Sequence, residues 1–362
     1  MLIFGEFLKT AQDNMRRLKL HFKLIFSVLI LFFIINTGRA QDYKFSQFYN
    51  SPLNLNPAFT GKIASLYRFV ANYRMQYFTL QSPSPYNTLS ASADFGLFRN
   101  QLRGDIFGLG LMVSNDRQTA IKTNQLYLAV AYHKGMGKNK RHFLSAGAEI
   151  GFLQRHIDLN NLYFADQFDQ SNYTFSLQSQ EISKFTTDKY IKMNINLGLF
   201  WSSNFTKSLS AYAGVSFFNI VQPQETFFAA DNERKFRYNA HLGMIYQIKK
   251  LMIISPNAMF MQQSKFLQWI VGSSFGFNLS GKDEPFNTVI SVGAWYDGNG
   301  ALIASTCFQF SGFQVGLSYD ATIQKDLTKA NKSVGAVELS LIYVGKPVER
   351  TKQYQPLFCP RF

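Results

Sequence analysis

The chain has 362 residues, and its 37 Lys and Arg against 22 Asp and Glu give a formal net charge of +15. Charged residues make up only 16% of the chain, below the roughly 25% of an average soluble domain. Abundant aromatic residues exclude a disordered chain. A helical membrane protein is excluded because only one stretch approaches the length of a spanning helix. Low charge, many aromatic residues and a near-neutral mean hydropathy favour a transmembrane β-barrel.

The first 40 residues have the order of a secretory signal peptide. Basic residues at 16–23 precede an apolar run at 24–35, and small residues occupy the −3 and −1 positions of a cut after Ala40. We therefore expect residues 1–40 to be a cleaved signal peptide, with Met15 as an alternative start. An uncleaved N-terminal anchor is the competing interpretation.

The mature chain opens with a segment that is unlike a strand. Residues 41–61 carry little charge, and Pro52 and Pro57 lack the N–H group that a sheet needs. We expect a periplasmic segment that packs into the barrel mouth as a plug or docks onto a partner. Its candidate docking residues are Phe45, Phe48 and Tyr49.

From residue 62 onward, apolar residues alternate with polar or small residues, which is the two-residue period of a strand with two different faces. The pattern predicts an all-β fold, a transmembrane antiparallel barrel over residues 62–346. A soluble β-sandwich is the alternative, but the polar faces are rich in Gly, Ser and Asn and suit a lumen better. The fourteen predicted strands are 62–79, 86–99, 103–117, 120–135, 141–157, 190–204, 207–221, 233–249, 250–263, 265–280, 285–298, 300–311, 312–325 and 331–346.

The connections between these segments alternate in length. One set is short and mostly basic, whereas the other contains the two longest loops, 158–189 and 222–232. Barrels of the bacterial outer membrane have short periplasmic turns and longer outer loops. We therefore expect both termini in the periplasm, including a C-terminal tail, 347–362. The tail supplies three further candidate docking residues, Tyr354, Leu357 and Phe358.

Catalytic, cofactor and metal sites are not expected. The string Gly-Ser-Ser-Phe-Gly at 272–276 matches a nucleophile motif, but it lies in mid-strand rather than in the required strand-to-helix turn. No metal-ligand spacing, phosphate-binding loop or dinucleotide fingerprint occurs. The positive charge is scattered through an exported chain, so we expect no nucleic-acid partner.

Charged residues on the polar faces are the remaining candidate site. On barrel closure the first and last strands become neighbours, which brings Arg68 or Arg74 near Glu338. We favour a structural network that fills the lumen over a solute channel. The network's members are Arg68, Arg74, Asp94, Glu149, Arg155, Arg237, Asp320 and Glu338.

Several short elements resemble the PorP/SprF family of Bacteroidetes outer-membrane proteins. They are the mature N-terminus with Asn56-Pro57-Ala58-Phe59, the Tyr73-Arg74-Met75-Gln76-Tyr77 element, the closing strands at 317–320 and 335–341, and the Cys359-Pro360-Arg361-Phe362 ending. The resemblance implies a component of the type IX secretion system. Its implied partners are periplasmic ring proteins, or one large secreted surface protein such as a gliding adhesin, besides outer-membrane lipid. The alternatives are a passive porin and a structural adhesin anchor.

Overall fold

The computed structural model describes residues 42–78, 86–98, 104–137, 140–159, 162–227, 233–280, 287–324 and 334–345. The chain divides into two units, Met1–Ala40 and Gln41–Phe362, and every described residue belongs to the second unit. The predicted signal peptide and the predicted tail at 347–362 lie outside the described residues.

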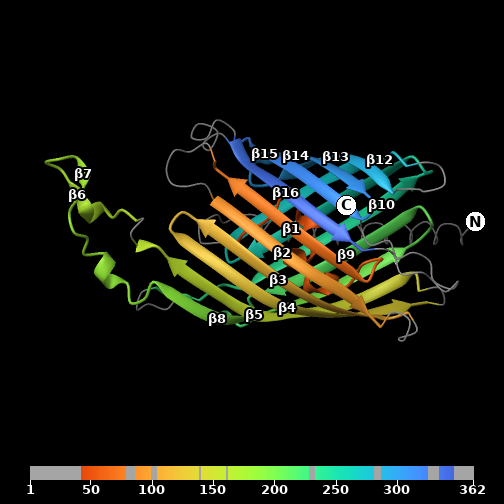
Figure 1. Cartoon of the computed structure of the whole chain (residues 1–362), viewed down its shortest axis with the longest axis horizontal. Coiled ribbons are helices and arrows are strands. Elements are labelled where there is room, and N and C mark those ends of the chain that lie inside the picture. Colours follow the sequence, from red (N-terminus) through yellow and green to blue (C-terminus); the bar gives the residue numbers. More distant parts are fainter. Residues whose placement is uncertain are drawn as a thin grey trace, which may run out of the picture. The chain divides into compact units, whose positions relative to one another are not determined.

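Fourteen antiparallel strands of the described chain close into a barrel (Figure 1), which confirms the predicted fold class. Consecutive barrel strands pair along the chain, and β1 pairs with β16 to close the sheet. Each strand overlaps one of the fourteen predicted segments. The strands are β1 (Tyr67–Gln76), β2 (Tyr86–Leu97), β3 (Ile106–Gln118), β4 (Ile121–Met136), β5 (His142–Ile157), β8 (Lys189–Asn204), β9 (Leu209–Phe218), β10 (Arg237–Ile248), β11 (Met252–Gln263), β12 (Phe266–Asn278), β13 (Thr288–Asp297), β14 (Ala301–Phe310), β15 (Phe313–Thr322) and β16 (Val334–Val344).

The two faces of the barrel follow from the two-residue period of the sequence. On β3, Leu109, Leu111 and Val113 are exposed on the outer face, whereas Met112 and Ser114 are buried on the inner face. The outer face is therefore apolar and suited to lipid, whereas the inner face combines polar and small residues with large apolar ones such as Met112. Among the described residues, no helix is long and apolar enough to cross a membrane.

The two ends of the barrel differ. We call one end the short-turn end, because the turns that leave β4, β8, β10 and β14 there are short. One of them is the two-residue hairpin Ser311-Gly312, with φ values of 46° and 92°, which matches the right-handed twist of the flanking strands. The start of β1 and the end of β16 also lie at this end. The opposite end, which we call the long-loop end, carries the connection between β5 and β8.

That connection forms an arm, residues 162–188, which extends beyond the barrel strands (Figure 1). It contains the 3-10 helices η4 (Ala165–Gln167) and η5 (Ile182–Lys184) and a small hairpin of β6 (Phe168–Asp169) and β7 (Thr174–Phe175). Contacts among aromatic rings hold the hairpin together, such as the 5.2 Å between the ring centroids of Phe168 and Phe175. The sequence predicted a long loop here but not the hairpin.

Candidate functional site in the barrel lumen

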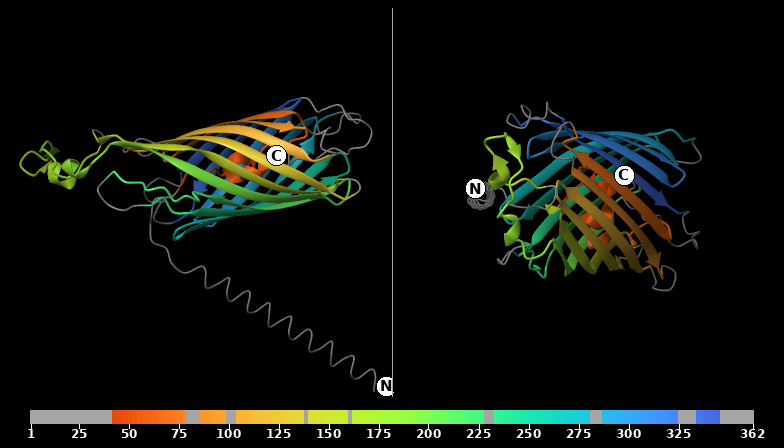
Figure 2. Two further views of the ribbon diagram at one scale, coloured as in Figure 1. Left: turned by 90° about the horizontal axis from the view of Figure 1, so that it is seen from below. Right: turned by 60° about the vertical axis from the view of Figure 1, so that its left-hand side comes forward.

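The chain fills its own barrel with the segment that precedes the first strand. Residues 42–65, which we call the plug, lie inside the lumen (Figure 2). The plug contains η1 (Phe48–Asn50), α2 (Pro52–Leu55) and η2 (Pro57–Phe59). Pro52 and Pro57 each start one of these short helices, a position where a missing N–H costs little. The same prolines that exclude an ordinary strand therefore shape the plug.

Apolar packing holds the plug in the centre of the lumen. Phe59 packs on Phe200 of β8 with 4.4 Å between ring centroids, and Tyr49 stacks on Trp295 of β13 at 4.9 Å. Phe45 and Phe48 are each only 4% exposed. The candidate docking residues Phe45, Phe48 and Tyr49 thus face the lumen wall, where no partner reaches them in this arrangement. The other three candidates, Tyr354, Leu357 and Phe358, lie outside the described residues.

Glycine residues on the barrel wall make room for the plug backbone. A Cβ atom at Gly147 would lie 2.5 Å from the Ala58 nitrogen, and one at Gly108 would lie 1.9 Å from the Thr60 oxygen. Such distances are far below van der Waals contact, so larger side chains at these positions exclude the plug. The Gly-rich inner faces, which the sequence analysis attributed to a lumen, therefore serve close packing against the chain itself.

The plug spans the lumen from one end to the other. Its end next to β1 lies at the short-turn end, where the Gly61 N–H donates to Asp94 at 2.8 Å. Asp42 lies at the long-loop end, where its N–H donates to the side chain of Gln263 at 2.9 Å. The sequence predicts residues 41–61 as a periplasmic segment, on the same side as the C-terminal tail, that plugs the barrel mouth or docks onto a partner. In the structure, residues 42–61 run along the length of the lumen rather than stopping at its mouth, and Asp42 and Gly345 lie at opposite ends.

Buried ion pairs connect the plug to the closing seam between β1 and β16. Arg74 of β1 pairs with Glu338 of β16 and with Asp320 of β15, the latter at 2.9 Å. Glu338 also accepts hydrogen bonds from the backbone N–H groups of Ser46 and Gln47 at 2.5 and 2.8 Å. One carboxylate therefore binds both the first strand and the plug.

A second buried pair joins β1 and β2 nearer the short-turn end. Arg68 of β1 binds Asp94 of β2 with 2.9 Å between Nε and Oδ1, and its guanidinium also donates to the Phe59 carbonyl. The sequence placed Arg68, Arg74, Asp94, Asp320 and Glu338 on the inner face. The register shows that Arg68 pairs with its β2 neighbour, whereas Arg74 lies directly opposite Glu338.

The other predicted lumen charges form separate groups. Arg155 binds Glu225 at 2.8 Å, and Arg237 binds Asp42 at 3.2 Å, both at the long-loop end. Glu149 is fully buried near the middle of β5 and accepts from the Asn196 amide at 3.0 Å. The eight residues thus belong to several local clusters rather than to one continuous network.

Sequence reasoning missed three members of the cluster at the long-loop end. Arg234 binds both Asp42 and Glu225, and all three side chains are less than 10% exposed. Burial alone would raise the pKa of Asp42, because it disfavours the charged carboxylate. Attraction to Arg234 and Arg237, together with two hydrogen bonds, outweighs this effect and lowers the pKa of Asp42 to about 2. These residues lie in loops and in the plug, where strand alternation gives no information about direction.

Beside the plug, residues of the described part of the chain enclose a small cavity. A cavity of about 30 Å³ lies between the plug residues Tyr43 and Phe48 and the wall residues Arg237 and Met259. This volume holds one or two water molecules. At this level the lumen is a packed interior rather than an aqueous pore.

The fold and its filled lumen define a β-barrel of the outer-membrane type that is closed by its own N-terminal segment. A model of one family, the type IX secretion system membrane protein PorP/SprF, matches residues 37–343, which is most of the chain. The chain therefore belongs to the PorP/SprF family, and the resemblance noted in the sequence is confirmed. This family is one of secretion-system barrels and not of enzymes.

Two solved structures are among those similar to this chain. The Ralstonia pickettii toluene transporter TbuX has 10% sequence identity and a TM-score of 0.48, with 86% of this chain and 96% of that chain covered. The Pseudomonas putida toluene transporter TodX has 9% identity and a TM-score of 0.47, with 85% and 94% covered. A comparison with curated protein sequences gives no match.

Proposed function

We propose that this protein is a non-enzymatic outer-membrane barrel that supports secretion or cell-surface attachment of large surface proteins, such as gliding adhesins, by the type IX system. Membership of the PorP/SprF family supports a role in the type IX secretion system. One structural observation supports the mode of action. The plug occupies the lumen from end to end, so the barrel offers its two ends and its outer wall for contacts, not a path for solutes.

A passive porin is the alternative function. It would need an open lumen, whereas here Phe59 packs on Phe200 and Arg74 is buried among two carboxylates and the plug. Conductance of the purified protein in planar lipid bilayers separates the two functions. We expect a mostly closed barrel, and steady conductance by the wild-type protein would favour the porin.

We further propose that the short-turn end faces the periplasm. Short inner turns and longer outer loops are the usual asymmetry of such barrels. The tail after β16 then begins in the periplasm, where Tyr354, Leu357 and Phe358 are candidates for docking onto ring proteins. The arm, with Tyr163 and Tyr173 exposed at 72% and 83%, then faces the cell exterior and a secreted partner. An epitope inserted in the arm should be detected on intact cells, and an epitope at residue 362 only after lysis.

The decisive experiment is deletion of the gene in its source bacterium, with surface proteins quantified on intact cells by mass spectrometry. We expect one or a few large surface proteins to be lost and the wild-type gene to restore them. Complementation with a variant lacking residues 347–362, and with one in which a short Gly-Ser loop replaces the arm, then assigns the docking surfaces. Unchanged surface proteins in the deletion strain would contradict the proposal.

A further inference from the structure

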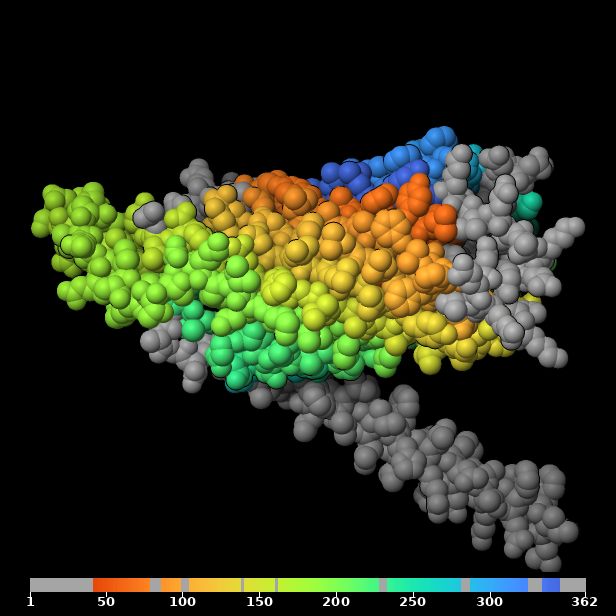
Figure 3. Space-filling view, turned by 60° about the horizontal axis from the view of Figure 1, so that its bottom comes forward, coloured from red at the N-terminus to blue at the C-terminus, as the bar shows by residue number. Residues whose placement is uncertain are grey.

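Basic side chains form a row on the outer wall at the long-loop end. In the sheet register Arg117 of β3 lies directly opposite Lys122 of β4, Lys122 opposite His156 of β5, and His156 opposite Lys189 of β8. All four lie on the outer face by strand alternation, and Figure 3 looks onto the wall that these strands form. Three permanent positive charges and one histidine therefore lie on neighbouring strands at one height.

This row has little neutralising charge of its own. Like charges directly opposite each other destabilise a sheet. Among the described residues, Arg117, Lys122 and Lys189 form no side-chain ion pair within 4 Å, whereas His156 lies 3.8 Å from Asp188 and Asp158 follows it by two residues. The row is a place where an external anion would lower the free energy of the folded barrel.

The wall changes character in ordered steps away from the row. Two residues along the strands, away from the long-loop end, lie the outward amides Asn115, Asn124 and Gln154. They are hydrogen-bonded across the strands at 2.6 and 3.3 Å. After two further residues, the positions are apolar and exposed, at Val113, Leu126 and Phe152. The order of basic, amide and apolar rows matches the phosphate, linkage and acyl-chain levels of a lipid leaflet.

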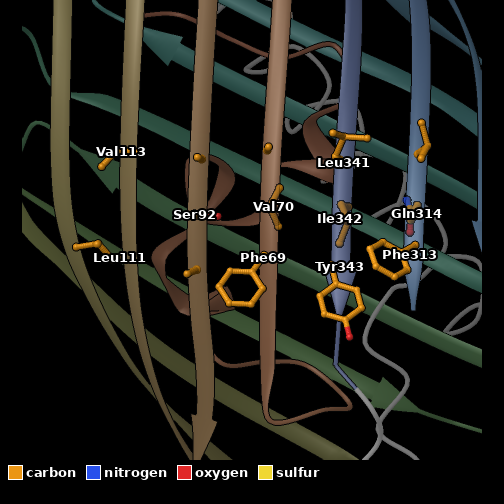
Figure 4. Close-up of a pocket in the computed structure, with 14 residues that line it drawn as sticks. Phe69, Val70, Ser92, Leu111, Val113, Phe313, Gln314, Leu341, Ile342 and Tyr343 are labelled. Atoms are coloured by element: carbon orange, nitrogen blue, oxygen red, sulfur yellow. The ribbon is translucent and has the colours of Figure 1, made fainter. Parts of the chain in front are cut away.

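An apolar groove of about 510 Å³ begins beside the apolar row (Figure 4). Ala71, Ala91 and Ala93 of β1 and β2 form its floor. Larger side chains form its walls, with Leu111 and Val113 on one side, and Phe313, Val315, Leu341 and Tyr343 on the other. Ala91 lies opposite Val113, which is on the same strand as Arg117 and four residues before it. At about 3.3 Å per residue, the groove starts ~13 Å from the Arg117 position, within the length of an acyl chain.

We propose that this wall is a binding site for an anionic lipid whose headgroup carries phosphate. The phosphate lies on Arg117, Lys122 and Lys189, the polar linkage contacts the amide row, and one acyl chain lies in the groove over Ala71, Ala91 and Ala93. A lipid fits better than free phosphate because the charged row and the groove form one continuous surface. A protein partner would not need the ordered change from charge to amide to hydrocarbon.

The test uses the full-length mature barrel in phosphatidylcholine nanodiscs, with phosphorylated lipid A as the probe and native mass spectrometry or competition as the readout. Dephosphorylated lipid A keeps the acyl chains and lacks the anion. We expect the wild-type protein to retain phosphorylated lipid A at least tenfold better than the dephosphorylated form, and less well as salt is raised. Millimolar inorganic phosphate should not compete, because it cannot use the groove.

Two pairs of variants separate the headgroup from the chain. The double variant Arg117→Gln with Lys122→Gln should lose about thirtyfold in retention, from about 1 kcal/mol for each basic residue. Its matched control, Lys235→Gln with Lys265→Gln, removes two positive charges from the same end of the barrel and should bind like the wild type. Ala91→Phe fills the groove and should weaken binding without any change in charge, whereas Ala304→Phe, on the outer face of β14 away from the groove, should not.

Equal retention of the two forms of lipid A would overturn the proposal. So would equal behaviour of the two double variants, since the effect would then depend on net charge alone. Competition by inorganic phosphate would assign the row to free anions, and unaltered binding by Ala91→Phe would remove the groove from the site. Heat-modifiable migration on gels checks that each variant is a folded barrel.

Discussion

Arg74 is the residue at which removal of one side chain should affect the barrel most. It is 5% exposed and contacts two carboxylates that are 6% and 1% exposed, Asp320 and Glu338. Arg74→Ala leaves both buried carboxylates without their cation. Removal of one member of a buried ion pair costs about 3–5 kcal/mol, because the remaining charge stays desolvated. We expect the free energy of unfolding to fall by that amount.

Glu338 allows the size of the Arg74 interaction to be measured. Glu338→Ala removes one partner of Arg74 and also the acceptor of the Ser46 and Gln47 N–H groups. In the double variant, Arg74→Ala with Glu338→Ala, the shared ion pair is lost only once. The summed losses of the two single variants should therefore exceed the loss in the double variant by about 1–3 kcal/mol.

The assay is urea-induced unfolding in lipid vesicles, followed by tryptophan fluorescence and heat-modifiable gel migration. Lys184→Ala provides a control, since the Lys184–Glu181 pair has side chains exposed at 61% and 47% and should leave the unfolding midpoint unchanged. Strictly additive losses for Arg74→Ala and Glu338→Ala would refute the coupling. If Arg74→Ala lowered the free energy of unfolding no more than Lys184→Ala does, the buried ion pair itself would be refuted.

Three further predictions concern the plug. Gly147→Ala places a Cβ 2.5 Å from the plug backbone and should destabilise the barrel or loosen the plug, measured as increased conductance. Gly276→Ala is the control, because its Cβ would meet only side chains at 3.1 Å and beyond, and its effect on stability and conductance should be small. Because the pKa of Asp42 is lowered from 3.8 to about 2, its carboxylate stabilises the fold above pH 4, and about 2 kcal/mol should be lost as the pH falls towards 2. The measurement is the free energy of unfolding at pH 5 and at pH 2.5. The difference between the two values should be smaller in Asp42→Asn than in the wild type. Equal differences in the two proteins would contradict a stabilising role of the Asp42 carboxylate. Asp42→Cys and Gln263→Cys, in a background with Cys307 and Cys359 changed to Ser, should be joined by a short thiol crosslinker in the folded barrel, and Asp42→Cys with Gly345→Cys should not.

The strands were predictable because alternation is a local property of the sequence. On β3 the exposed and buried residues alternate from Leu109 to Arg117, and the pattern is visible without any knowledge of the partners. Side-chain direction follows directly from this period, so the inward position of Arg74 and Glu338 was also predictable. The pairing of Arg74 with Asp320 follows from the closed topology, because β15 lies next to β16.

The position of the plug inside the lumen could not be predicted from the sequence, because the plug residues lack the two-residue alternation that orients the strands. Phe45, Phe48 and Phe59 indicate burial, but burial in a lumen and burial against a partner have the same composition. The direction of the plug depends on contacts of residues far apart in the chain, such as Asp42 with Gln263. For the same reason the cluster of Asp42, Glu225 and Arg234 was missed, since loop residues carry no alternation that orients them.

The plug also restricts how this barrel can take part in secretion. A folded or extended polypeptide could pass through the lumen only if the plug left, which would expose Phe48 and Phe59 and separate Glu338 from the Ser46 and Gln47 N–H groups. These contacts are distributed from the Asp42 end to the Gly61 end, so partial withdrawal breaks some of them without opening a path. The lumen is therefore better suited to rigidity than to transport. On the proposed function, contacts with cargo and with other components would then belong on the two ends and the outer wall, where the arm, the short turns and the basic row lie.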